Sequence, residues 1–160
     1  MRIAVSACLL GVACRYDSRS KPHSGVLRMI EGHDVLPICP EVAGGLSIPH
    51  PACEIVSGHN PDAGEGRLAV TDAEGIDQTE AFSRGAQVTL DAVREFEAEL
   101  AILKAKSPSC GTGLVYDGTF TGTLREGWGV AARALHAAGI PCIDEEQAEA
   151  AFPHASSIGG

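Results

Sequence analysis

The chain has 160 residues, with a hydrophobic fraction of 44% and a charged fraction of 21%, proportions typical of one globular domain. Its formal net charge of −9 argues against a nucleic-acid-binding protein, because affinity for phosphates depends on lysine and arginine. Aromatic residues make up only 4% of the chain, so the core must be built from aliphatic side chains.

The first half of the chain predicts a βαβ unit followed by a long loop. Residues 2–7 and 34–38 are short apolar runs bounded by turn signals, typical of buried parallel strands. Between them, apolar residues at helical spacing predict a helix over 23–31. Residues 43–66 are rich in glycine and proline and predict a loop that forms a pocket wall or lid, with a short strand over 67–71.

The second half alternates helices and strands. The clearest helix covers 79–99, where apolar residues recur at three- to four-residue steps and Thr79 is placed to cap the start. We then expect a strand over 100–104, a turn-rich region over 119–129, a helix over 130–138, a strand over 140–143 and a helix over 145–152. This order predicts an α/β fold with one compact Rossmann-like domain over 1–155, a mainly parallel sheet flanked by helices, and a frayed tail over 156–160.

Cysteine usage bears on compartment and chemistry. The sequence begins Met1-Arg2-Ile3 and leads directly into a strand-like run, without the parts of a signal peptide. No apolar stretch approaches the roughly 20 residues of a membrane-spanning helix, so a cytoplasmic protein without a membrane partner is expected. Thiols stay reduced in that compartment, so six cysteines indicate metal binding or catalysis before disulfides.

Three cysteines follow three of the apolar runs at tight turns: Cys8, Cys39 and Cys110. The carboxyl ends of parallel strands line one crevice of an open α/β sheet, so these thiols are expected to converge there. Three thiolates at one point repel each other unless a metal or a metal cluster neutralises them. The sequence therefore predicts a metallocluster site, while Cys142 is expected in the core and Cys53 in the loop as a free thiol.

Other reactive side chains flank these cysteines. Glu41 follows Cys39 after a stiffening proline, near enough to transfer a proton to a metal-bound group, and the alternative is a surface carboxylate at a helix start. The turn Ser107-Pro-Ser-Cys-Gly111 places two hydroxyls beside the third thiol, and the alternative is an ordinary serine-rich turn. The predicted substrate contacts in these two turns are Ser109, Gly111 and Gly44.

A set of short motifs, taken in order, covers about residues 3–145. The motifs are Ser6-Ala-Cys-Leu-Leu-Gly11, Cys14-Arg-Tyr-Asp17, Cys39-Pro-Glu-Val42 with Gly44-Gly-Leu46, Glu54-Ile55, Ala101-Ile-Leu-Lys104, Ser107-Pro-Ser-Cys-Gly111, Tyr116-Asp-Gly-Thr-Phe120 and Gly127-Trp-Gly-Val130. Together they resemble the small-protein family that includes thiouracil desulfidase. The ordered set is far more specific than any one of its members.

The resemblance implies a [4Fe–4S] cluster held by Cys8, Cys39 and Cys110, with one iron not ligated by protein, and catalytic roles for Glu41 and Ser107. An enzyme of this kind would remove sulfur from a thiolated nucleobase such as 2-thiouracil, or a related thiocarbonyl compound, and release hydrosulfide. The open iron would polarise the C=S bond, Glu41 would move a proton, and Ser107 would orient the ring or the water. Carbon exchanges sulfur for oxygen at one oxidation level, so no external electron is needed.

Two positions depart from the pattern of this family. His50 stands where arginine is common and Ser18 where glycine is common, so both bear on the identity of the substrate. Two other functions stay open at this point. One is a non-catalytic iron–sulfur or zinc protein that senses or carries sulfur, with Cys14 as candidate fourth ligand. The other is a thiol enzyme with Cys110 as nucleophile. The sequence sets no oligomeric state.

Overall fold

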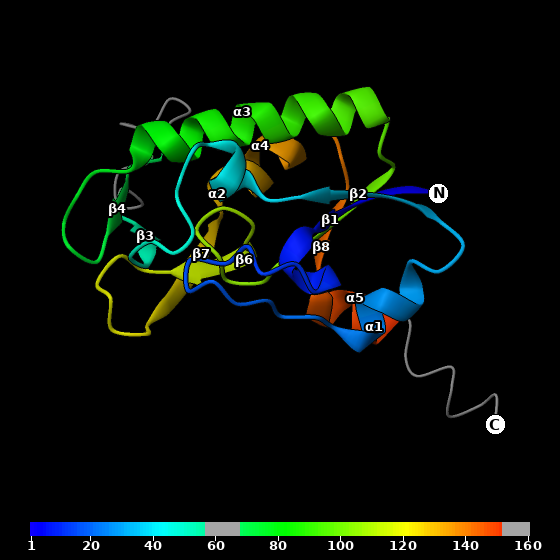
Figure 1. Ribbon diagram of the computed structural model, residues 1–160, viewed down its shortest axis with the longest axis horizontal. Helices are drawn as coiled ribbons and strands as arrows, with labels where there is room; N and C mark the ends of the chain where they lie inside the picture. The colour runs from blue at the N-terminus through cyan, green and yellow to red at the C-terminus, as the bar shows by residue number, and fades with distance from the viewer. Residues whose placement is uncertain (57–67, 152–160) are drawn as a thin grey trace.

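Four parallel strands form the central sheet of the computed structural model, which describes residues 1–56 and 68–151 (Figure 1). They are β1 (Arg2–Ser6), β2 (Asp34–Ile38), β5 (Leu100–Leu103) and β8 (Cys142–Asp144), in the order β2-β1-β5-β8. Ile3 of β1 pairs with Val35 of β2 on one side and with Leu100 of β5 on the other. The predicted α/β class with a parallel sheet is confirmed, whereas the domain limits at 155 and 156 fall outside the described residues and stay a prediction.

Helices cover both faces of this sheet. Figure 1 shows α3 (Thr79–Phe96) and α4 (Val130–Ala137) on one face, with α1 (Ser24–Met29) and α5 (Glu145–Ala151) on the other. The short helix α2 (Pro40–Ala43) follows β2 and packs against α3. A 3-10 turn, η1 (Ala7–Leu10), follows β1 directly. The expected βαβ unit is therefore present, although α1 ends at Met29, two residues before the predicted end at 31.

Alternate residues of the strands face two separate cores, as the two-residue period of a strand requires. One core joins β1, β5, α3 and α4 through Ala4, Leu90, Val93, Ala101, Leu103, Ala132 and Leu135. The other joins β1, β5, α1 and α5 through Ile3, Val5, Val26, Ile102 and Ala148. The buried members of these two cores are aliphatic apart from cysteines, as the low aromatic content predicted, whereas a third cluster contains the buried Phe82.

Helix α3 begins and ends differently from the prediction. Thr79 is its first helical residue and does not cap it, because the N-cap position is Gln78 and makes no side-chain capping bond. Instead, Asp77 accepts the backbone N–H of Thr79 at 2.9 Å and its hydroxyl at 2.6 Å. The helix ends at Phe96, three residues early, because Glu97 adopts a left-handed conformation with φ of 58°.

Two antiparallel strand pairs lie outside the central sheet. The strand β3 (Cys53–Ile55) falls inside the predicted loop, and its partner β4 (Val70–Asp72) overlaps the short strand predicted over 67–71. The strands β6 (Thr112–Tyr116) and β7 (Leu124–Trp128) form a hairpin, so a turn-rich region extending to 129 is wrong from Leu124 onward. Gly113 lies opposite Gly127 in that hairpin, and these glycines interrupt the alternation that would have indicated strands.

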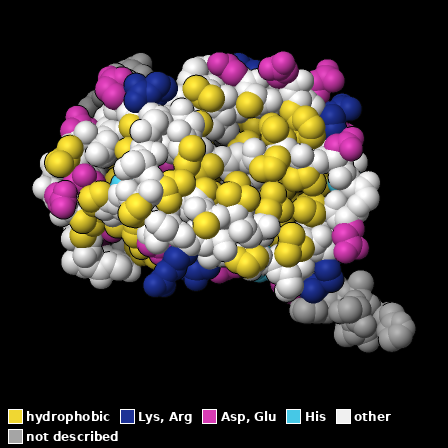
Figure 2. Space-filling model, in the orientation of Figure 1, with side chains coloured by type: hydrophobic (Ala, Val, Ile, Leu, Met, Phe, Trp, Pro, Cys, Tyr) yellow, Lys and Arg dark blue, Asp and Glu magenta, His cyan; other side chains and the backbone are white. Residues whose placement is uncertain are grey.

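Charged and apolar side chains are unevenly distributed on the face seen in Figure 1. Hydrophobic side chains gather over the middle of that face, and most lysines, arginines and acidic residues lie toward its edge (Figure 2). Among the described residues, no helix combines the length and the apolar character that crossing a bilayer requires.

Candidate active site

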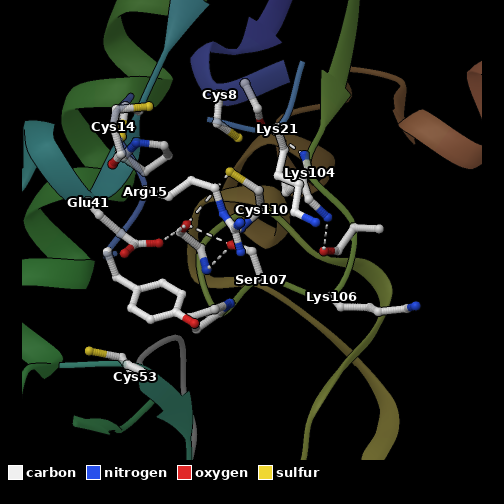
Figure 3. Close-up of a pocket in the computed structure, with 18 of the residues that line it drawn as sticks. Cys8, Cys14, Arg15, Lys21, Glu41, Cys53, Lys104, Lys106, Ser107 and Cys110 are labelled. Atoms are coloured by element: carbon white, nitrogen blue, oxygen red, sulfur yellow. Dashed lines mark hydrogen bonds between the residues drawn. The ribbon is translucent and has the colours of Figure 1, made fainter. Parts of the chain in front are cut away.

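A cavity of about 560 Å³ opens at the carboxyl ends of the sheet strands (Figure 3). Cys8, Cys39 and Cys110 all line it, and in Figure 3 the sulfur atoms of Cys8 and Cys110 point toward one another. Strand β1 ends two residues before Cys8, and β2 ends immediately before Cys39. The structure thus brings together the three thiols chosen from the strand ends.

Cys8 is positioned by the 3-10 turn that follows β1. Its carbonyl accepts the backbone N–H groups of Gly11 at 3.2 Å and Lys21 at 2.9 Å, which folds the following segment back over the turn. Gly11 closes the turn with φ of 97°, a conformation that glycine adopts without steric cost. Burial raises the pKa of the Cys8 thiol to about 11, and the positive charges of Lys104 and Arg15 oppose that rise.

Cys39 occupies the N-cap position of α2, in extended conformation, and Pro40 begins the helix. A fourth cavity thiol, Cys14, lies beside it, and the Cys39 sulfur is 3.7 Å from the Cys14 carbonyl oxygen. The hydrogen bond between the two thiols lowers the pKa of Cys39 to about 7, helped by the backbone N–H of Val42, and raises that of Cys14. Of the three predicted ligands, Cys39 alone has a lowered pKa.

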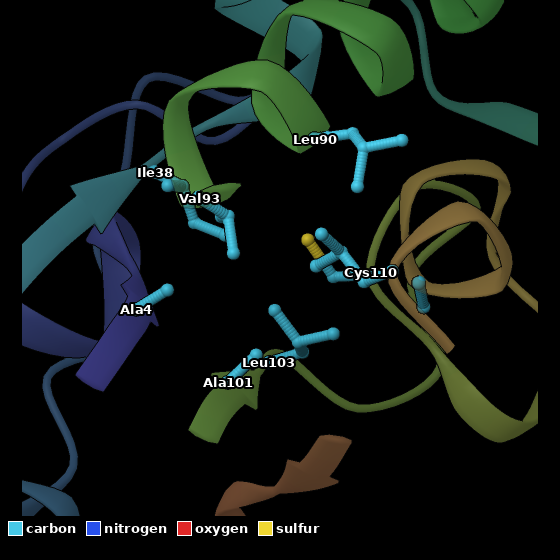
Figure 4. Packing of buried hydrophobic residues seen from close by; sticks show 9 residues of the cluster. Ala4, Ile38, Leu90, Val93, Ala101, Leu103 and Cys110 are labelled. Atoms are coloured by element: carbon cyan, nitrogen blue, oxygen red, sulfur yellow. The ribbon is translucent and has the colours of Figure 1, made fainter. Parts of the chain in front are cut away.

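Cys110 is buried at the end of the serine-rich turn, among hydrophobic residues of β5, α3 and α4 (Figure 4). Burial raises the pKa of its thiol to about 12, and the hydroxyls of Ser6 and Ser109 oppose the rise. Ser107 shapes the turn, since its hydroxyl oxygen accepts the N–H of Ser109 at 3.1 Å and of Cys110 at 2.9 Å. The start of α4 holds the turn in place.

Glu41 connects the two cysteine-bearing turns. Its Oε2 accepts the Ser109 hydroxyl at 2.9 Å, and the Ser109 and Ser107 hydroxyl oxygens lie 2.9 Å apart. Its Oε1 lies 3.1 Å from Nε2 of His50. The Glu41 side chain is 18% exposed and lines the cavity, so the alternative of a solvated surface carboxylate is wrong.

Cations surround the cavity of this acidic protein. Arg15, Lys21, Lys104 and Lys106 line it. Lys104 donates to Glu145 at 2.9 Å and to the Ala105 carbonyl at 3.2 Å, and Glu145 also accepts the Ala105 N–H. Sequence reasoning missed these residues, although a lysine directly after the buried strand β5 was a signal for Lys104. It also missed His50 as a partner of Glu41.

The remaining predicted site residues occupy different surroundings. Ser109 lines the cavity, whereas Gly44 and Gly111 do not belong to its lining in the described part of the chain. Gly44 packs against α3, where an added Cβ would meet the Ala81 carbonyl oxygen, and Gly111 packs against the carbonyl oxygens of Ser107 and Leu114. Substrate contacts by these two glycines stay a prediction.

The structure also shows the surroundings of Cys142, Cys53 and Ser18. Cys142 is half-buried and packs against the first core, as expected. Cys53 is a free thiol, as expected, but it lies buried in β3 and lines the cavity, so its predicted place in a loop is wrong. Ser18 has φ of 65°, a left-handed conformation that favours glycine, which explains the glycine common there in the resembling family.

The donor set fits an iron–sulfur cluster. In residues 1–56 and 68–151, no three His, Cys, Asp or Glu side chains are gathered to hold a single metal ion. In a cluster each cysteine binds its own iron, so three thiols on the walls of one roomy cavity suit a cluster better than one shared ion. Soft thiolate ligands select iron–sulfur clusters, zinc and copper(I).

Comparisons with known proteins place the chain in a family. The family model for 2-thiouracil desulfurase matches residues 3–147. An uncharacterised protein of Bacillus subtilis, YbbK, is 38% identical over 145 residues, covering 91% of this chain and 96% of YbbK. The solved structure of the [4Fe–4S]-dependent thiouracil desulfidase TudS is similar with a TM-score of 0.81 and 38% identity, covering 98% of both chains. The chain therefore belongs to the 2-thiouracil desulfurase family of enzymes, as its motifs predicted.

Proposed function

We propose that this protein is a [4Fe–4S]-dependent desulfidase that replaces the sulfur of a thiolated nucleobase with the oxygen of water. With 2-thiouracil and water as reactants, the products are uracil and hydrogen sulfide, which at neutral pH is released partly as hydrosulfide and a proton. The C=S bond breaks and a C=O bond forms at one oxidation level, so no electron donor is required. The observation that carries the proposal is the shared cavity of Cys8, Cys39, Cys110 and Glu41.

Cys8, Cys39 and Cys110 would hold the cluster. Each comes from a different turn at the carboxyl end of the sheet, and all three line the cavity. A cluster with three protein ligands supplies one open iron, a soft Lewis acid suited to polarising a thiocarbonyl sulfur. The positive charges of Arg15 and Lys104 oppose the rise in the pKa of Cys8. They therefore favour the thiolate form that a metal requires.

Glu41 is the proton-transfer group of this proposal. Its carboxylate lies on the cavity wall and can take a proton from the attacking water or give one to a ring nitrogen. The Ser109 hydroxyl donates to Oε2 of Glu41 and holds the carboxylate on the cavity wall. The Ser107 oxygen already accepts the N–H groups of Ser109 and Cys110, so both of its lone pairs are engaged and its hydroxyl hydrogen is left to donate. That hydrogen can go to the Ser109 oxygen, 2.9 Å away, or turn to the substrate or the water.

The alternative function is a non-catalytic iron–sulfur or zinc protein that senses or carries sulfur. Its support is Cys14, a further thiol of the cavity, which lies beside Cys39. A protein of that kind would complete its metal site with four cysteines and leave no position for a substrate. Metal content and turnover separate the two functions.

The test is anaerobic purification or reconstitution, followed by iron and sulfide counting, a visible spectrum and incubation with 2-thiouracil without reductant. We expect iron and sulfide in equal amounts, near four per chain, and formation of uracil together with sulfide. One zinc per chain, or a full cluster that converts no thiolated base, would overturn the proposal in favour of the carrier or sensor.

A further inference from the structure

Both ring nitrogens of His50 face oxygen atoms. Nδ1 lies 2.7 Å from the backbone carbonyl oxygen of Pro51, and Nε2 lies 3.1 Å from Oε1 of Glu41. A carbonyl oxygen can only accept, so Nδ1 must carry a hydrogen and donate it to Pro51. A second hydrogen lies between Nε2 and Oε1. Both ring nitrogens are therefore hydrogen-bonded, and the partner of Nε2 is Glu41, the proposed proton-transfer group.

The surroundings of His50 hold this arrangement in place. Its backbone N–H donates to the Tyr16 carbonyl at 2.9 Å, which ties the residue to the segment that follows Cys14. Its side chain is only 9% exposed, and the Cys53 sulfur lies 4.0 Å from Nδ1. His50 is not part of the cavity lining among the described residues, so it stands behind Glu41. An imidazole enclosed in this way cannot follow a moving carboxylate and instead fixes it.

We propose that His50 is a positioning residue for Glu41: it occupies Oε1 and leaves Oε2, the oxygen contacted by Ser109, as the atom that exchanges protons in the cavity. The inference rests on the proposed desulfidase function of the same site. Two hydrogen bonds, one to each oxygen, fix the plane of the carboxylate. Without His50, the carboxylate can rotate and present either oxygen.

The charge distribution supports this role. The hydrogen bond with Glu41 raises the pKa of His50, although burial opposes the rise. The bond between them is charge-assisted, which makes it stronger and more directional than a neutral one.

Nitrogen-15 spectra of the histidine rings test the contact itself, on the full chain without cluster. In the wild-type protein at neutral pH we expect the Nε2 of His50 to show the shift of a protonated nitrogen. Glu41→Gln should move it toward the shift of an unprotonated nitrogen, because the carboxylate is lost. His23 is the internal control, because it is not among the described residues that line the cavity and its Nε2 lies 3.5 Å from Oε2 of Glu149. The nitrogen signal of His23 should not move. An unchanged His50 signal in Glu41→Gln would overturn the inference.

Turnover by the cluster-loaded enzyme tests the consequence. His50→Ala should lower kcat about 10- to 100-fold, with a smaller change in KM, because a misplaced catalytic group costs up to about 10² in rate. His50→Gln should recover most of the loss, since its amide can donate to Oε1 from nearly the same position. His23→Ala should keep the wild-type rate. Equal rates in wild type and His50→Ala, or equal losses in the alanine and glutamine variants, would overturn the inference.

The two arms separate this inference from the function on which it rests. If the loaded wild-type enzyme converts no thiolated base, the proposed function fails, and the spectra still decide whether His50 binds Glu41. If His50→Ala does not fold, the glutamine variant and the spectra of Glu41→Gln carry the decision. If the wild-type enzyme is active but the His50 signal is the same in Glu41→Gln, the proposed function stands and the positioning role is refuted.

Discussion

The contact between α2 and α3 offers the sharpest test of how this site is positioned. Gly85 of α3 faces Pro40, and Gly44, the C-cap residue of α2, faces Ala81, so that the two helices approach with no side chain between them. A Cβ added at Gly85 would lie 2.0 Å from the Pro40 carbonyl oxygen, whereas real Cβ contacts are essentially never shorter than 3.0 Å. In Gly85→Ala the helix α2 must therefore move away by about 1 Å or more.

That shift acts directly on the site, because α2 follows Cys39 and contains Glu41. A displacement of about 1 Å in a catalytic group can cost about 10² in rate. The effect on stability is expected to be smaller, since an overpacked contact costs about 1–3 kcal/mol while alanine in a helix interior recovers about 1 kcal/mol relative to glycine. Gly85→Ala should thus lose activity out of proportion to its loss of stability.

The assay compares uracil formation, iron content and Tm in Gly85→Ala and in a matched control, Gly139→Ala. Gly139 has φ of 84° and nothing within 4 Å of an added Cβ, so alanine there meets only backbone strain of about 1–2 kcal/mol. The control should lose a similar amount of stability and keep its activity. If Gly85→Ala turned over at the wild-type rate, α2 would not be held by this contact and the reasoning would be refuted.

Three further predictions concern the site itself. Glu41→Gln should retain the cluster, by iron and sulfide counts, and lose about 10²–10⁴ in kcat, and normal turnover would remove Glu41 from the mechanism. Cys39→Ser should abolish cluster content, whereas Cys142→Ala should keep it, and equal loss in both would show that the ligands are misassigned. The raised pKa of His50 stabilises the folded state fully below the ordinary value of 6.5 and loses this effect as pH rises through the raised value. The stability advantage of the wild-type chain over His50→Gln, measured by denaturant unfolding of the cluster-free protein, should accordingly decline from pH 6 upward, and a constant difference would contradict the shift.

Much of the fold could be predicted where apolar periodicity is strong. The strands β1, β2 and β5 are continuous apolar runs, and α3 carries a long apolar stripe, so local sequence was sufficient for them. The hairpin of β6 and β7 could not be found in this way, because Gly113 and Gly127 face one another and provide no side chain to alternate. Likewise, β3 is three residues long and depends on pairing with β4, a partner distant in sequence.

In the site too, some features follow from the sheet topology and others depend on side-chain contacts that the sequence does not indicate. A general property of parallel sheets indicated that Cys8, Cys39 and Cys110 would share a crevice, and all three line the cavity. The contact of His50 with Glu41 depends on how the segment after α2 returns to the cavity, and no local periodicity reports that path. The choice between Ser107 and Ser109 as the direct partner of Glu41 also required side-chain geometry, which selects Ser109.

The short helix α2 and its N-cap position carry both a predicted cluster ligand and the proposed proton-transfer group. Cys39 is its N-cap and Glu41 lies two residues later, so the distance between the thiol and the carboxylate is fixed by a single helical turn. Ser109 and Cys110 share a second turn, which the start of α4 holds through backbone hydrogen bonds. The bond from Ser109 to Glu41 joins these two turns across the cavity. Each turn therefore supplies one thiol and one polar side chain. A movement that opens the cavity would separate the two thiols and also break the hydrogen bond from Ser109 to Glu41. The close contact of Gly85 with Pro40, behind α2, opposes such a movement.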